Sequence, residues 1–168
     1  MEGSNPVLVK RFAGIACPKT YGDPALLCPL FYSPPKPRAR KRIGLIPYIK
    51  DVNEPWLHEP HSEPSVKVID ICGGIEKVVN DVTSCDGILS STLHGLIVAD
   101  ACGVPSNWVR FQDEVPDRWF KYRDYMLSVG RPERSPFHLE GFQSVARAAE
   151  LAFHGELDID LGPVHASA

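Results

Sequence analysis

The feature that most constrains the fold is a regular alternation of short apolar runs and helix-patterned segments between residues 43 and 111. Apolar runs at 43–47, 66–71, 87–91 and 107–111 are typical of buried strands, and helical spacing predicts helices at 75–84 and 93–101. Strands that alternate with helices over short connections indicate parallel strands joined by right-handed crossovers. We therefore predict an α/β fold, a Rossmann-like parallel sheet with helices on both faces.

The segments on either side of this alternation suggest a simple division of the chain. Residues 1–42 are predicted to be an N-terminal segment that ends in a basic linker, since 33–42 holds three prolines and five basic residues. Residues 43–156 form the predicted domain. It includes a short helix within 112–135 and a closing helix at 139–154, whose expected buried face is Phe142, Val145, Ala146, Ala149, Ala152 and Phe153. Residues 157–168 are predicted to be a tail that is frayed after Gly162.

Composition narrows the class of protein. The chain has 168 residues and a net charge of −3, with 43% apolar residues, so it can bury a core and is not a general nucleic-acid binder. It has no apolar run long enough to span a membrane and does not begin with a signal-peptide pattern, so we expect a cytoplasmic protein. Five scattered cysteines without a CxxC pair predict free thiols: Cys17, Cys28, Cys72, Cys85 and Cys102.

The most informative candidate site is the turn at residues 90–95. In a parallel sheet, ligands bind beyond the carboxyl ends of the strands, which here are the loops 48–52, 72–74 and 90–94. In the last of these, the run Ser90-Ser91-Thr92-Leu93-His94-Gly95 leads from a strand directly into a helix. Hydroxyl groups and the free amides of a helix N-terminus suit a phosphate or a carboxylate. The same residues are also ordinary helix caps, so an anion site and a purely structural turn both remain open.

Five segments, in order, resemble the polysaccharide pyruvyl transferase family, most closely its exopolysaccharide branch. They are YGDPALLCPLFY (21–32), KRIGLIP (41–47), VIDIC (68–72), SCDGILSSTLHGLIVADACGVP (84–105) and YRDYMLSVGR (122–131). The resemblance implies transfer of a pyruvyl group from phosphoenolpyruvate to a hexose of a surface polysaccharide or exopolysaccharide, giving a ketal. It also implies the C-terminal half of a glycosyltransferase-B-like fold, with no cofactor and no metal.

The resemblance also implies roles for individual residues. His94 is the expected catalytic residue, either as a proton donor or as a clamp on the donor phosphate. Ser90, Ser91, Thr92, Leu93 and Gly95 would form the anion cradle. Thr92 stands where many members have Arg, so the cation is expected from Lys50 or Arg110, and Tyr48 stands where members often have His.

The resemblance covers one half of the family's two-domain architecture. We therefore expect an exposed apolar surface where the other half would dock, and a homodimer or a partner chain that supplies it. Two other functions remain open. One is a non-catalytic half-domain that binds an anion or a sugar; the other is a sugar-nucleotide glycosyltransferase, which would need an acid for the ribose.

The remaining candidates have more ordinary interpretations. His58 and His61 could hold a metal, but Pro60 prevents regular helix geometry between them. A serine hydrolase would need a GxSxG turn, which is absent. The pair Gly73-Gly74 is interpreted as helix packing, the basic run 36–42 as a solvated linker, Asp23 as a backbone cap and Asp100 as structural.

Overall fold

A computed structural model describes residues 22–35, 42–58, 65–112 and 119–158. Its centre is a parallel sheet of five strands in the order β2-β1-β3-β4-β5. The strands are β1 (Ile43–Ile46), β2 (Val66–Val68), β3 (Gly87–Ser90), β4 (Ser106–Arg110) and β5 (Phe137–His138). The predicted α/β class and parallel sheet are confirmed.

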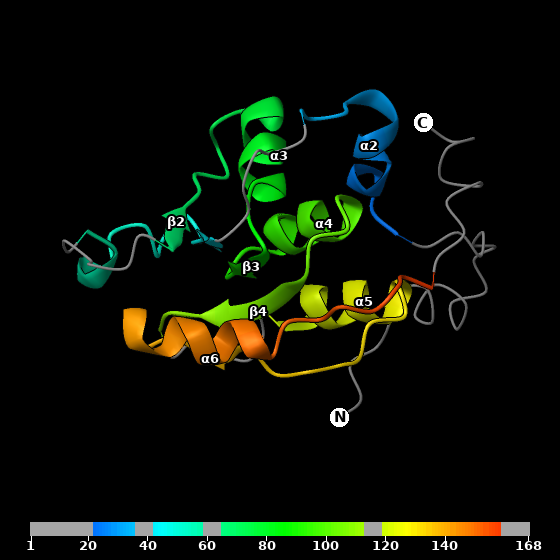
Figure 1. The fold of residues 1–168 in the computed structure, drawn as a ribbon. Coiled ribbons are helices and arrows are strands. Elements are labelled where there is room, and N and C mark those ends of the chain that lie inside the picture. The colour runs from blue at the N-terminus through cyan, green and yellow to red at the C-terminus, as the bar shows by residue number, and fades with distance from the viewer. Residues whose placement is uncertain (1–21, 36–41, 59–64, 113–118, 159–168) are drawn as a thin grey trace.

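Helices cover both faces of this sheet (Figure 1). They are α2 (Cys28–Phe31), α3 (Ile75–Thr83), α4 (Leu93–Ala101), α5 (Phe120–Ser128) and α6 (Val145–Glu150), with 3-10 turns at Pro24–Leu27, Pro55–His58 and Phe142–Ser144. Because successive strand residues point to opposite faces, neighbours in a strand enter different clusters. Leu45 and Leu89 pack with Val145 of α6, whereas Ile46 and Ile88 pack with Val82 of α3.

Residues 136–150 depart from the expected single closing helix. Phe137 and His138 form a fifth strand beside β4, and the next residue, Leu139, donates its amide to the Arg110 carbonyl. The α-helix starts only at Val145, after Gly141 (φ 151°) and a 3-10 turn. Its buried residues are Val145 and Ala148, so the expected face was wrong in placing Ala146 inward. The other predicted strands and helices end within a few residues of the observed bounds.

The described part of residues 1–42 packs on the sheet domain. Leu26, in the 3-10 turn at Pro24–Leu27, lies in one buried cluster with Leu96 of α4 and Met126 of α5. Asp23 caps this turn by accepting a hydrogen bond from the Ala25 amide, as expected. Most of the basic linker and the end of the tail lie outside the described residues, so the predicted domain boundaries stay predictions.

A buried ion pair holds the C-terminal segments to the sheet. Arg131 donates to both Asp100 oxygens at 2.6 and 2.8 Å, and each side chain is 4% exposed. Arg131 also donates to Ser106 Oγ and Ser106 O at the start of β4. The Tyr125 hydroxyl donates to Asp100 at 2.7 Å, and its pKa is raised by burial and by this carboxylate. Asp100 therefore has the structural role that the sequence predicted.

Two negative findings concern the described residues. Within the described ranges, no helix combines the length and apolar character needed to cross a bilayer. The described cysteines, Cys28, Cys72, Cys85 and Cys102, are free thiols, and Cys17 lies outside the described residues.

Candidate functional site

The strand order places a switch point between β1 and β3. From β1 the chain moves outward to β2 and then returns past β1 to β3, so the connections leave the two central strands in opposite directions. Loops that diverge in this way open a crevice at the carboxyl ends of the strands, which is where doubly wound α/β proteins bind ligands. Here the two loops are 47–54, after β1, and the turn at Ser91 and Thr92, after β3.

The two loops are joined by a pair that the sequence analysis did not identify. Ser91 Oγ donates to Asp51 Oδ2 at 2.6 Å and accepts from the Tyr48 amide at 2.8 Å. Asp51 is 5% exposed, although it belongs to a polar loop. The Tyr122 hydroxyl donates to the Ser91 carbonyl at 2.8 Å and so ties α5 to the same turn.

A small cavity lies against this pair. Its lining includes Asp51, Ser91, Arg110, Gln112 and Tyr122. The space open to a water-sized group is about 20 Å³, and one water needs about 10–15 Å³ on that measure. The cavity therefore has room for one small polar group.

Three of the predicted cradle residues have internal roles in this structure. Ser90 is fully buried, and its hydroxyl donates to the Thr92 carbonyl and accepts from the Thr92 amide. At Gly95, an added Cβ would collide with Ser90 Oγ and would lie 3.1 Å from Ile46 Cγ2. Gly95 thus lets the first turn of α4 approach β3 closely, and Thr92 is a buried N-cap residue whose side chain makes no capping hydrogen bond.

The other predicted site residues lie at the carboxyl edge of the sheet. His94 is exposed on the first turn of α4, where the first helical amides have no partner within the helix. Leu93 beside it is half-buried and packs against the cluster that contains Leu96. Lys50 is exposed in the turn after β1, and Arg110 ends β4 and donates to the Gln112 carbonyl. Their proposed roles in binding stay predictions.

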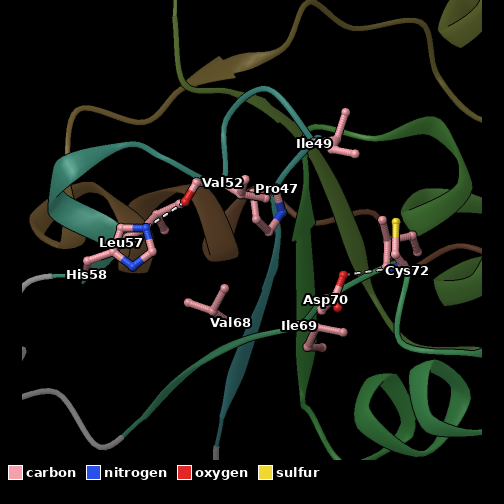
Figure 2. A pocket seen from close by; sticks show the side chains of 10 residues that line it. Pro47, Ile49, Val52, Leu57, His58, Val68, Ile69, Asp70 and Cys72 are labelled. Atoms are coloured by element: carbon pink, nitrogen blue, oxygen red, sulfur yellow. Dashed lines mark hydrogen bonds between the residues drawn. The ribbon is translucent and has the colours of Figure 1, made fainter.

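A second and larger pocket lies at the carboxyl ends of β1 and β2 (Figure 2). Its volume is about 500 Å³, and most of its lining is aliphatic: Pro47, Ile49, Val52, Leu57, Val68, Ile69 and Ile71. The two polar side chains drawn there bond to the main chain. Asp70 accepts from the Cys72 amide, and His58 Nε2 lies 2.6 Å from the Val52 carbonyl oxygen.

The residues around this pocket relate to two predictions from the sequence, an exposed apolar surface and a metal site at His58 and His61. Ile49 and Val68 are 61% and 42% exposed, so an apolar surface is present, while the partner expected to cover it stays a prediction. His61 lies outside the described residues, so the pairing of His58 with it is untested. The described ranges contain no group of three or more residues that could ligate a metal.

Comparison with known proteins identifies one family whose model matches more than half of the chain. The family model described as polysaccharide pyruvyl transferase matches residues 9–112, which includes β1 to β4 and the turn that bears His94. The chain is 32% identical over 136 residues to uncharacterized protein L143 of Acanthamoeba polyphaga mimivirus. That match covers 78% of the chain and 47% of the viral protein, so the chain spans about half of its curated relative. No solved structure matches the chain.

Proposed function

Because the chain belongs to the polysaccharide pyruvyl transferase family, we propose that it supplies the donor-binding part of an enzyme that transfers a pyruvyl group from phosphoenolpyruvate to a hexose. The hexose would belong to a surface polysaccharide or exopolysaccharide. The observation that carries the proposal is the exposed His94 on the first turn of α4, at the switch point of a sheet within the matched residues.

The reaction explains which groups such a site needs. A proton adds to the methylene carbon of phosphoenolpyruvate, and positive charge develops at the carbon that bears the phosphate. Two hydroxyl oxygens of the sugar form bonds to that carbon, inorganic phosphate leaves, and the two hydroxyl protons balance the new methyl group and the released phosphate. The site must therefore hold an anion, deliver a proton and orient the acceptor hydroxyls.

The residues at the sheet edge suit the first two tasks. The amides at the start of α4 and the positive end of its dipole favour an anion. The His94 imidazolium would either contact the donor phosphate or deliver the proton, and Lys50 and Arg110 would add positive charge nearby. Ser90 does not belong to this set, because its hydroxyl is buried and bonded internally.

Since the chain spans about half of the viral relative, we propose that a complete enzyme needs a second half-domain facing this edge. A half-site should bind the donor weakly, with a dissociation constant of about 1 mM, or −4 kcal/mol. Binding of the donor, and not turnover, is therefore the primary measurement.

An NMR titration with phosphoenolpyruvate and with inorganic phosphate tests the proposal. The wild type should show shifts at the amides of residues 93–96. His94→Ala should weaken binding by roughly 1.5–3 kcal/mol, the range for a charge-assisted hydrogen bond. His154→Ala is the control, because His154 is also exposed but lies after α6. Absence of shifts at 93–96 would refute the donor site, and equal binding by wild type and His94→Ala would remove the role of His94.

A further inference from the structure

We propose that Ser91 and Asp51 bind a hydroxyl group of the saccharide acceptor, and that Ser91 is not part of the anion cradle. This inference rests on the proposed function, and it assigns the acceptor contact within the same site. Hydrogen-bonding capacity, charge and space each support it.

The hydrogen-bonding capacity of Ser91 is the first argument. A serine hydroxyl has one hydrogen and two lone pairs. The carboxylate of Asp51 only accepts when ionised, so the hydrogen of Ser91 is used on Asp51 at 2.6 Å. One lone pair takes the Tyr48 amide at 2.8 Å. After these two bonds, Ser91 Oγ has one lone pair left and no hydrogen. It can therefore accept a hydrogen bond from the O–H of a sugar, but it cannot donate one to a phosphate or a carboxylate.

The charge of Asp51 is the second argument. Its side chain is buried, and its interaction with other charges is therefore screened less than that of a surface carboxylate. A phosphate placed against Ser91 would need a donor there, and the Ser91 hydrogen is already given to this carboxylate. A neutral sugar hydroxyl that donates to Ser91 would instead form a stronger hydrogen bond, because Ser91 donates in turn to the Asp51 carboxylate and the two bonds polarise each other.

The size of the adjoining cavity is the third argument. About 20 Å³ is open to a water-sized group beside Asp51 and Ser91. This space has room for one hydroxyl group. The half-buried indole of Trp119 also lines this cavity and is a surface that suits the C–H face of a sugar ring.

The position of Ser91 and Asp51 next to the start of α4 determines where the acceptor would lie relative to the donor. Ser91 ends the strand side of the turn and His94 stands on its helix side, three residues later in the same turn. A donor held at the start of α4 would thus have its reacting carbon next to a hydroxyl held on Ser91. Ser91 is the contact residue, and Asp51 is a positioning residue that acts through it.

Binding of two small probes to the full chain tests this assignment. Methyl β-D-galactopyranoside stands for the acceptor and inorganic phosphate for the donor, both followed by amide NMR shifts. Ser91→Ala should abolish the glycoside shifts at residues 48–51 and 91 and leave the phosphate affinity within twofold. Asp51→Asn should weaken the glycoside about tenfold, because it replaces a charge-assisted network by a neutral one.

Asp70→Asn is the matched control, since it removes an exposed carboxylate from the end of the neighbouring strand. It should change neither titration. The melting temperature of each variant shows whether it folds, and Asp51→Asn keeps the proposal testable if Ser91→Ala does not.

Three results would overturn the inference. The first is weaker phosphate binding by Ser91→Ala, and the second is the absence of glycoside shifts in the wild type. The third is a shift of Ser91 with uridine, whose ribose also offers hydroxyls, together with no shift from the glycoside. Failure of the proposed function has a different signature. In that case phosphate and phosphoenolpyruvate leave residues 93–96 unshifted, whatever the glycoside does at Ser91.

Discussion

Replacing Arg131 by Met should be among the most destabilising single changes in the described part of the chain. Arg131 and Asp100 are each 4% exposed, and the guanidinium contacts both carboxylate oxygens at 2.6 and 2.8 Å. The variant leaves Asp100 buried with only the hydroxyl groups of Tyr125 and Ser106. Removing one partner of a buried ion pair costs about 3–5 kcal/mol, because the remaining charge is uncompensated.

Equilibrium unfolding in urea measures this cost. With a slope of about 2 kcal/mol per molar urea, the midpoint should fall by about 2 M. Arg123→Met is the matched control, because Arg123 pairs with Glu133 on the surface, where the side chains are 44% and 41% exposed. An exposed pair contributes about 0–1 kcal/mol, so the midpoint of the control should shift by less than about 0.5 M.

A double variant separates the loss of charge pairing from the loss of packing. Adding Asp100→Leu to Arg131→Met removes the stranded carboxylate, so the double variant should be more stable than Arg131→Met alone. The reasoning is refuted if Arg131→Met costs no more than Arg123→Met. It is also refuted if the two buried substitutions are simply additive, because residues in one network should show coupling.

Two further predictions concern packing at the turn and the pH dependence of stability. Gly95→Ala should destabilise the fold by roughly 1–3 kcal/mol in the same urea assay, because the new methyl group meets Ser90 and Ile46; an unchanged midpoint would contradict the close approach of α4 to β3. Burial raises the pKa of Asp124, so its ionisation opposes folding. At a pH above the folded-state pKa of Asp124, Asp124→Asn should therefore have a higher melting temperature than the wild type. At a pH below the ordinary carboxyl range, the two melting temperatures should be equal. A higher melting temperature that persists in acid would point to another cause.

The central sheet and its order of elements could be predicted from the sequence because each element carries its own periodic pattern. Val78, Val79 and Val82 on α3, and the apolar runs of β1 and β3, are local signals that tertiary packing did not override. β5 was missed because it has only two residues, Phe137 and His138, which make no alternating pattern and pair solely because Arg110 is adjacent.

The place of the turn at residues 90–95 between a strand and a helix could be predicted from the sequence, but the hydrogen-bond partners of its hydroxyl groups could not. The turn at residues 90–95 was found because a strand runs directly into a helix there. What each hydroxyl does depends on partners far away in the sequence: Asp51 for Ser91, and the Ile46 carbonyl as a second partner for Ser90. Asp51 lies in a polar loop, and only the meeting of two crossover loops buries it.

The all-parallel pairing of the sheet has a consequence for how the chain acquires its structure. Among the described strands, no neighbouring pair can close as a hairpin, because all four pairs are parallel. The central pair, β1 with β3, requires the chain to place β2 outside β1 before or while β3 arrives. The chain must therefore lose the conformational entropy of long loops before the stabilising contacts between distant strands form, which slows folding. During that delay Leu45, Ile46 and Leu89 are exposed, so the nascent chain should depend on dilution or chaperones to avoid aggregation.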